Sequence, residues 1–137
     1  MRDDSTPDAA SVAARFNEAI TSRDLEALDR LMTDDHVFVD TAGGTVEGRR
    51  ACRDAWRGFF AAFPDYRNHF TAVVADGDLV AMAGRSDCSY PELAGPALWR
   101  AAIRDSRVAR WQVLADTPAN RRDLGLPVAS ANPSADP

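Results

Sequence analysis

The chain of 137 residues contains no lysine, only two cysteines and only two histidines. All 16 basic residues are therefore arginine, which we interpret as a bias of genomic composition and not as a functional feature. The 21 acidic residues give a net charge of −5, and no basic stripe alternates with aromatic residues, so nucleic-acid binding is disfavoured. Cys52 and Cys88 lack the spacing of metal ligands, and we expect two thiols in place of a disulfide.

Long hydrophobic runs are also missing, since no stretch approaches the ~20 apolar residues that cross a membrane. The N-terminal residues Met-Arg-Asp-Asp-Ser are not followed by the apolar segment of a secretory signal. We therefore expect a cytoplasmic protein without a membrane partner. The sequence also lacks a nucleophile elbow, a phosphate-binding loop and a dinucleotide fingerprint, so it predicts binding or chemistry without a metal or other cofactor.

The N-terminal third of the chain changes from a helical to a strand-like hydrophobic pattern. Apolar residues recur every three or four positions over residues 12–20 and again over residues 25–32, as on one face of each of two helices. The following stretch alternates with the period of two of a strand, which places on one face His36, Phe38 and Asp40. The sequence thus predicts two helices followed by a strand that ends on a carboxylate.

The rest of the chain predicts one more helix and an antiparallel meander. The helix is expected over residues 49–63, and strands are expected over residues 66–74, 79–90, 97–104 and 108–116. This order of elements is typical of an α+β fold. We predict a cone-shaped α+β barrel in which a curved, mostly antiparallel sheet wraps around the N-terminal helices, with a pocket in its interior. A single domain is expected over residues 11–126, with disordered segments at residues 1–10 and 127–137.

Several short motifs follow one another along this domain. They are Arg23-Asp-Leu-Glu-Ala-Leu28, Asp34-Asp-His-Val-Phe-Val-Asp40, Val46-Glu-Gly-Arg49, Ala62-Phe-Pro-Asp65, Asp76-Gly-Asp-Leu-Val80, Arg104-Asp-Ser-Arg-Val108, Trp111 and Asp123-Leu-Gly-Leu126. In this order they resemble the nuclear-transport-factor-two-like superfamily, in particular its SnoaL-like polyketide cyclases, ketosteroid isomerases and limonene-epoxide hydrolases. The resemblance implies the cone-shaped fold and a homodimer, whereas the chemistry differs among the members.

When the residues of two of these groups are carried over one by one, the ketosteroid isomerases are disfavoured, and half of the limonene-epoxide hydrolase site is present. The resemblance places the proton-transferring carboxylate of ketosteroid isomerases at Asp40, but their hydrogen-bonding tyrosine falls on Phe16 and their neutral acid near Trp99. Neither residue can hold an oxyanion as a phenol or a protonated carboxyl does. The resemblance places the Arg-x-Asp pair of limonene-epoxide hydrolases on Arg85 and Asp87. Their second carboxylate falls on Val113, and their water-holding tyrosine and asparagine fall on Phe38 and Asp40.

Each candidate residue also has a structural interpretation. Asp40 precedes Thr-Ala-Gly-Gly and either caps that turn as an Asx-turn or faces the pocket, where burial would make it a usable base. Arg85 and Asp87 form either a surface ion pair or a charged pair aimed into the pocket, and the apolar Ala81 and Ala83 on the same face favour the pocket. The residues expected to bind substrate are His36, Phe38, Phe16, Trp56, Phe59, Tyr66, Asn68, Trp99 and Trp111. The aromatic residues among them and His36 would also suit a hydrophobic core.

These observations predict a cofactor-independent acid–base enzyme that acts on a small, apolar, oxygenated molecule, in secondary metabolism. The reaction is expected to be a cyclisation, an isomerisation or an epoxide opening. Asp40 would take the proton, and Arg85, oriented by Asp87, would stabilise negative charge on oxygen. The alternative is a non-catalytic small-molecule-binding or assembly protein that uses the same pocket.

Overall fold

The computed structural model describes residues 8–128. The elements in chain order are α1 (Ala9–Thr21), α2 (Leu25–Leu31), β1 (Met32–Val39), β2 (Thr45–Glu47), α3 (Arg49–Ala62), β3 (Arg67–Asp76), β4 (Leu79–Asp87), the 3-10 turn η1 (Pro91–Leu93), β5 (Gly95–Arg104), β6 (Arg107–Leu114) and α4 (Pro118–Leu124). Of the two terminal segments predicted to be disordered, residues 1–7 and 129–137 lie outside the described residues. Residues 8–10 are ordered, because Asp8 caps α1 by accepting a hydrogen bond from the backbone N–H of Ser11 at 2.8 Å.

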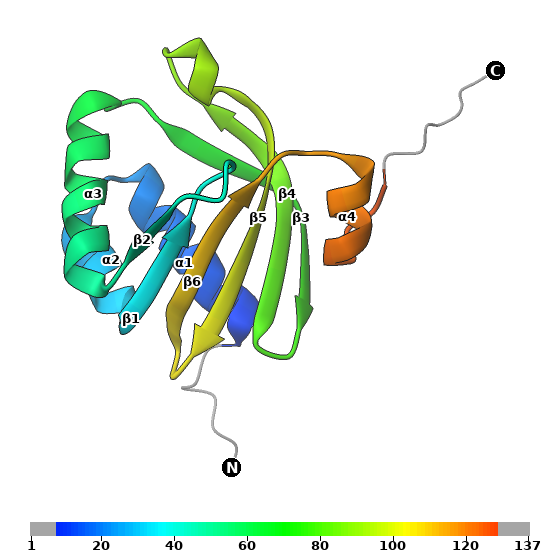
Figure 1. Ribbon diagram of the computed structural model, residues 1–137, viewed down its shortest axis with the longest axis horizontal. Helices are drawn as coiled ribbons and strands as arrows, with labels where there is room; N and C mark the ends of the chain where they lie inside the picture. Colours follow the sequence, from blue (N-terminus) through cyan, green and yellow to red (C-terminus); the bar gives the residue numbers. More distant parts are fainter. Residues whose placement is uncertain (1–7, 129–137) are drawn as a thin grey trace.

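The strands form one six-stranded sheet in the order β2-β1-β6-β5-β4-β3 (Figure 1). Neighbouring strands are antiparallel except β1 and β6, which run parallel. The sheet curves but does not close, because β2 and β3 remain as its two edges. The predicted cone-shaped α+β fold with a mostly antiparallel sheet is thereby confirmed.

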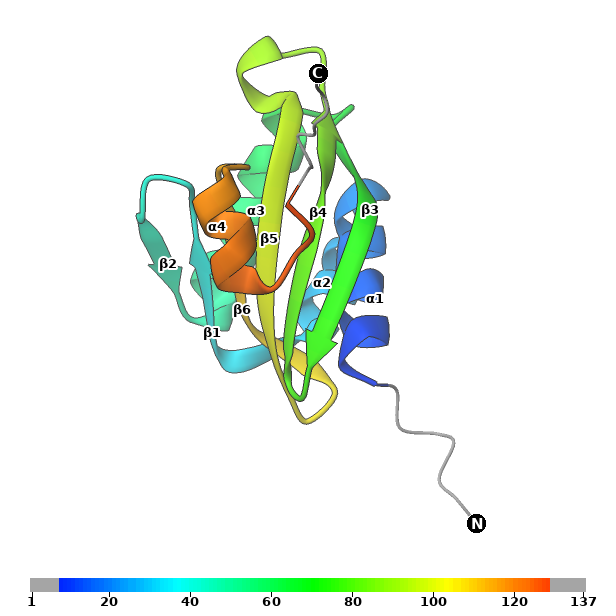
Figure 2. The same ribbon diagram turned by 90° about the vertical axis from the view of Figure 1, so that its right-hand side faces the viewer.

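The helices divide between the two faces of the sheet. The first three helices cover the concave face, and α4 lies against the convex face (Figures 1 and 2). The main core fills the concave side, where Val12, Phe16 and Ile20 of α1 are fully buried, as their spacing predicts. A smaller apolar cluster on the convex side brings Leu126, just after α4, onto Ala81, Ala83 and Leu98 of the sheet.

Two local predictions are wrong at the junction between α2 and β1 and in the turn that follows. The second helix was expected to include Met32, but α2 ends at Leu31 and Met32 begins the strand. Met32 is fully buried and pairs with Val108 of β6, so its tertiary contacts outweigh its helical spacing. The segment after the turn was not predicted as a strand, but Thr45–Glu47 pairs antiparallel with β1 as the short edge strand β2.

The predicted homodimer stays a prediction. The convex face carries a small apolar cluster, and α4 and Leu126 already cover part of it. Within residues 8–128, no helix is both long and apolar enough to cross a membrane.

Candidate functional site

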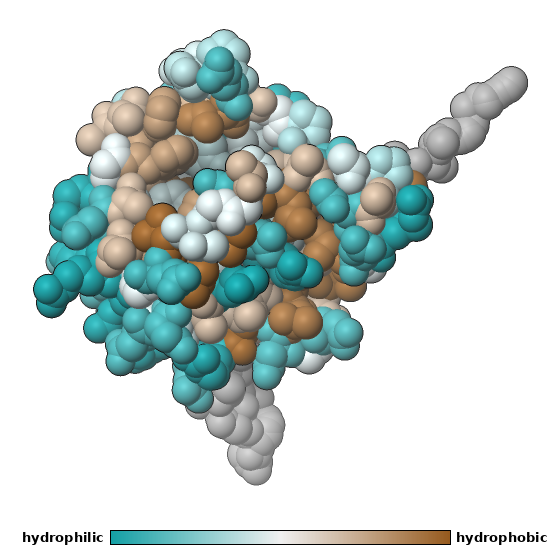
Figure 3. Space-filling view, viewed as in Figure 1, coloured by the Kyte–Doolittle hydropathy of each residue, from teal (hydrophilic) through white to brown (hydrophobic). Residues whose placement is uncertain are grey.

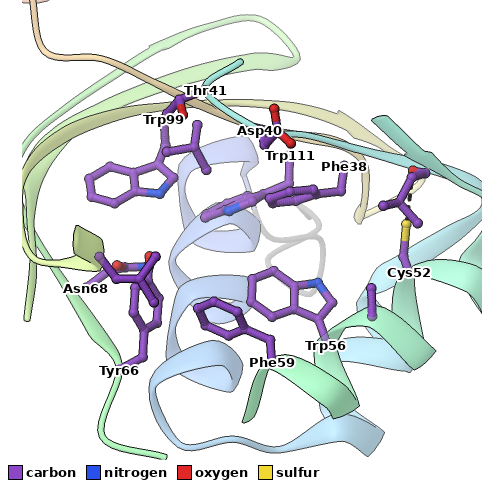
Figure 4. A pocket seen from close by; sticks show the side chains of 14 residues that line it. Phe38, Asp40, Thr41, Cys52, Trp56, Phe59, Tyr66, Asn68, Trp99 and Trp111 are labelled. Atoms are coloured by element: carbon purple, nitrogen blue, oxygen red, sulfur yellow. Dashed lines mark hydrogen bonds between the residues drawn. The ribbon is translucent and has the colours of Figure 1, made fainter. Parts of the chain in front are cut away.

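A cavity of about 330 Å³ lies between α3 and the concave face of the sheet. It opens to the surface in the hollow between α3, η1 and the β1–β2 turn (Figure 3). Its lining residues are Phe38, Asp40, Thr41, Val46, Cys52, Ala55, Trp56, Phe59, Tyr66, Asn68, Leu93, Trp99, Trp111 and Val113. Most of these side chains are apolar, and few polar groups face the interior (Figure 4), which is typical of small-molecule sites.

The helix α3 supplies one wall of the cavity because its apolar residues lie on one face. Trp56 and Phe59 point toward the sheet (Figure 4), whereas Arg50 and Arg57 of α3 are exposed. Trp56 packs edge-on against Phe38 with ring centroids 5.8 Å apart, and Phe59 packs edge-on against Tyr66 at 4.8 Å. These edge-to-face contacts hold the aromatic rings in defined orientations.

The opposite wall comes from the sheet. Phe38 of β1 and Trp111 of β6 are register partners across the parallel pair, and Trp99 of β5 lies on the same concave face. The indole nitrogen of Trp99 is buried and has no hydrogen-bond partner among residues 8–128. Figure 4 places this nitrogen on the side of the ring turned toward the middle of the cavity. An unpaired buried N–H costs about 1–3 kcal/mol, and this cost falls when a bound molecule supplies an acceptor.

A chain of hydrogen bonds leads from α1 to the cavity wall. Asn68 donates from Nδ2 to Oδ1 of Asn17 at 3.0 Å and accepts at Oδ1 from the Ser86 hydroxyl at 2.6 Å. The Ser86 oxygen lies 3.1 Å from the hydroxyl of Tyr66. Burial raises the pKa of Tyr66, so its phenol stays protonated at neutral pH.

Asp40 lies at the mouth of the cavity, directly after β1. Its Oδ1 accepts hydrogen bonds from the backbone N–H groups of Ala42 at 2.9 Å and Gly44 at 2.8 Å, which is an Asx-turn. Asp40 also lines the cavity, so the same side chain caps the turn and lies at the cavity mouth. The expected burial of Asp40 among aromatic residues is wrong, because its side chain is exposed.

Arg85 and Asp87 do not point into the cavity, which corrects their predicted placement. Arg85 donates from Nε to Oδ1 of Asp87 at 3.0 Å, and His69 lies 3.0 Å from the other carboxylate oxygen. The three side chains are about half exposed, at 55%, 46% and 52% for Arg85, Asp87 and His69. The hydrogen bond from Arg85 lowers the pKa of Asp87. The group is therefore a surface ion-pair network on the convex face, and a guanidinium and a carboxylate do not meet inside the cavity.

His36 and Phe16 lie deeper than predicted and do not line the cavity. Both are fully buried, and their rings are 5.6 Å apart in the core beneath Trp111. Nδ1 of His36 donates to the carbonyl oxygen of Val108 at 2.6 Å, and burial lowers the pKa of the imidazole. His36 is thus neutral near pH 7, with its proton on Nδ1. The other residues predicted to bind substrate do line the cavity.

Several lining residues were missed in the sequence, namely Thr41, Val46, Cys52, Ala55, Leu93 and Val113. The helical spacing of Cys52, Ala55, Trp56 and Phe59 could have identified the first two on α3. Both cysteines are free thiols, as expected, and burial raises the pKa of Cys52. Among the described residues, no three His, Cys, Asp or Glu side chains gather as metal ligands would.

Comparison with solved structures gives the same fold at low sequence identity. A protein from Sinorhizobium meliloti proposed to be a polyketide cyclase is 21% identical, with a TM-score of 0.68 over 75% of this chain and 93% of that one. A hypothetical protein from Catenulispora acidiphila with a ketosteroid isomerase-like fold, solved with trimethylamine, is 20% identical, with a TM-score of 0.67 over 85% and 94% of the two chains. An epoxide hydrolase from Mycobacterium tuberculosis that resembles the limonene enzymes is 18% identical, with a TM-score of 0.70 over 79% and 82%.

These identities show a shared fold and leave the activity open. No curated protein matches the sequence. The model of the SnoaL-like domain family matches residues 13–130, which is most of the chain and includes every residue that lines the cavity. The chain therefore belongs to the SnoaL-like domain family.

Proposed function

We propose that the protein binds a small, apolar, oxygenated molecule in its aromatic cavity and performs a cofactor-independent acid–base reaction on it. The observation that carries this proposal is a cavity with mostly apolar walls and a carboxylate, Asp40, at its mouth. The reaction classes open to such a site are cyclisation, isomerisation and epoxide opening. Its structural neighbours include a proposed polyketide cyclase and an epoxide hydrolase.

In this proposal Asp40 is the proton acceptor. The Asx-turn fixes the direction of its carboxylate, because Oδ1 is held by two backbone N–H groups while Oδ2 is not engaged by either of them. Because Asp40 lines the cavity at its mouth, a molecule that fills the cavity lies next to this carboxylate. Arg85 and Asp87 have no part in this reaction, because they lie outside the cavity.

A second candidate is non-catalytic binding in the same cavity. One observation favours it: Asp40 already has a structural role in the turn and is exposed, so its presence there is explained without catalysis. Both candidates require the cavity to hold a ligand, and they differ only in whether Asp40 moves a proton.

The test uses 1-tetralone, an apolar bicyclic ketone, as the probe. We expect the wild-type protein to accelerate exchange of deuterium from D₂O into the carbon next to the ketone, followed by NMR, or to open cyclohexene oxide, followed by gas chromatography. Asp40→Asn should abolish the reaction, because the amide oxygen can still accept both turn hydrogen bonds but is far too weak a base.

Thermal unfolding and the affinity for 1-tetralone should be unchanged in Asp40→Asn, which separates catalysis from folding and binding. Binding of the ketone by a wild-type protein that catalyses neither reaction would favour the non-catalytic candidate. Retention of the activity in Asp40→Asn would remove Asp40 from the mechanism.

A further inference from the structure

The hydrogen-bond chain behind the cavity wall has a fixed direction. Asn17 donates from Nδ2 to the backbone carbonyl oxygen of Asn68 at 3.3 Å, so its Oδ1 must face Asn68 as an acceptor. Asn68 meets that oxygen with its Nδ2, which turns its own Oδ1 toward Ser86. Two oxygens 2.6 Å apart need one hydrogen between them, and only the Ser86 hydroxyl has one to give.

The direction of this chain determines what Tyr66 can offer to a ligand. Because the single hydrogen of Ser86 is engaged with Asn68, the contact between Ser86 and Tyr66 at 3.1 Å requires the phenol to donate. The hydrogen of Tyr66 therefore points away from the cavity, into the wall. The oxygen of Tyr66 keeps lone pairs, so this residue accepts hydrogen bonds from a ligand and does not donate them.

Trp99 provides the opposite polarity. Trp99 lines the cavity, and its buried indole N–H has no acceptor among the described residues. An indole nitrogen can only donate. In Figure 4, Trp99 lies on the same side of the cavity as Tyr66 and Asn68, across from the ring of Trp56.

We propose that the cavity recognises an apolar molecule with two polar groups, an O–H or N–H that donates to Tyr66 and an oxygen that accepts from Trp99. Hydroxylated ketones, including phenolic ones, are the simplest molecules of this class. Ser86 acts as a positioning residue, because it sets the polarity of Tyr66 without lining the cavity. This inference rests on the proposed function only in that the cavity must hold an apolar oxygenated molecule, and it does not require catalysis.

The test compares three probes that differ at one position: 6-hydroxy-1-tetralone, 6-methoxy-1-tetralone and 6-methyl-1-tetralone. The hydroxyl donates and accepts, the methoxy group only accepts, and the methyl group does neither. Since Trp56, Trp99 and Trp111 all line the cavity, quenching of their fluorescence reports binding directly. We expect the hydroxy probe to bind about threefold to tenfold more tightly than the other two, which should bind alike, as for one neutral hydrogen bond.

Variants should change this pattern in opposite ways. Tyr66→Phe should remove the preference for the hydroxy probe and leave the affinity of the methyl probe unchanged. Ser86→Ala frees the hydrogen of Tyr66, so the methoxy probe should gain affinity over the methyl probe. The matched control is Tyr90→Phe, which removes the hydroxyl of the other tyrosine, an exposed residue that does not line the cavity.

The donor role of Trp99 is tested with 5,6,7,8-tetrahydro-2-naphthol, which keeps the hydroxyl of the first probe and lacks its ketone. The wild type should bind this naphthol several-fold more weakly than 6-hydroxy-1-tetralone, and Trp99→Phe should reduce that difference.

Tighter binding of the methoxy than of the methyl probe by the wild type would show that Tyr66 donates, and would overturn the inference while leaving the proposed function intact. Equal binding of all three tetralones would overturn it as well. Failure of every probe to bind would refute the premise of both proposals. A hydroxy preference without any deuterium exchange would support the inference and count against catalysis alone.

Discussion

Gly84 of β4 packs directly against the backbone of His69 on the neighbouring strand β3, so closely that a Cβ atom at Gly84 would overlap the His69 carbonyl oxygen. The contact lies where the register between the two strands shifts by one residue, between Phe70 and Ala72. This shift is a β-bulge, which glycine accommodates because it has no side chain.

We predict that Gly84→Ala destabilises the protein by about 3 kcal/mol, because the new methyl group must push the two strands apart or remove the bulge. Thermal or urea unfolding followed by circular dichroism measures the loss. The matched control is Gly58→Ala in α3, where nothing lies within 4 Å of the added atom. This control should stabilise the protein by about 0.5–1 kcal/mol through its helix propensity. An unfolding curve for Gly84→Ala that overlays the wild type would mean that the bulge is not needed.

The same bulge determines the face of the sheet on which Arg85 lies. At the turn, Asp76 of β3 pairs with Leu79 of β4. If the pairing continued from there without a bulge, Phe70 would lie opposite Arg85. Since directly opposed residues share a face, and Phe70 packs against Trp99 on the concave side, Arg85 would then have pointed inward. One extra residue in β3 pairs Phe70 with Gly84 and turns Arg85 to the convex face. A bulge in an alternating pattern leaves no clear mark in a single sequence.

Arg85→Ala is predicted to leave ligand binding unchanged. Because Arg85 contacts Asp87 on the convex face, its removal should alter the affinity for 6-hydroxy-1-tetralone by less than about twofold, a change of about 0.4 kcal/mol. Trp56→Ala removes a large part of one wall and should weaken binding tenfold or more. Fluorescence titration measures both variants. A tenfold loss for Arg85→Ala would place the guanidinium in the site in spite of its outward position.

Asp40 and Gly44 offer a test of the turn at the cavity mouth. Asp40→Ala removes an acceptor of two backbone hydrogen bonds and should cost about 0.5–1.5 kcal/mol, measured as a fall in Tm, whereas Asp40→Asn should retain the turn. At Gly44 an added Cβ would lie 2.8 Å from Oδ2 of Asp40, so Gly44→Ala should displace the carboxylate. Loss of activity in Gly44→Ala with intact probe affinity would show that the direction of the carboxylate matters. Equal Tm values for Asp40→Ala and Asp40→Asn would refute the structural role.

His36 is predicted to make stability depend on pH in the acidic range. Burial lowers its pKa in the folded protein below the value of about 6.5 in the unfolded chain, so the unfolded state binds more protons as the pH falls. The free energy of unfolding should therefore have its full value above about pH 6.5. It should decrease as the pH falls from there toward the lowered pKa of His36 in the folded protein. Urea unfolding between pH 7.5 and pH 5 measures this slope.

His36→Gln should flatten that slope, since glutamine does not titrate, although the variant will be less stable at every pH. The control His69→Gln changes the exposed histidine beside Asp87 and leaves the contribution of His36 in place. A slope that survives in His36→Gln would assign the pH dependence to other groups.

The sequence was most informative where burial is one-sided. At the start of β3, Tyr66 and Asn68, which the resemblance places on the inward face, do line the cavity, whereas Arg67 and His69, which alternate with them, are exposed. On β4, Ala81 and Ala83 were rightly expected to be buried, but they lie on the convex face under Leu126. Both faces of that strand are covered, so burial alone could not indicate which one faces the cavity.

The parallel pairing of β1 with β6 joins the early part of the sheet to its last strand. Phe38 is held against Trp111, more than seventy positions later in the chain, and both rings form the same wall. During synthesis the N-terminal helices can form early, but the binding chamber cannot exist until β6 has emerged from the ribosome and docked. A nascent or truncated chain that stops before β6 would thus carry most of the aromatic side chains of the site and still be unable to enclose a ligand.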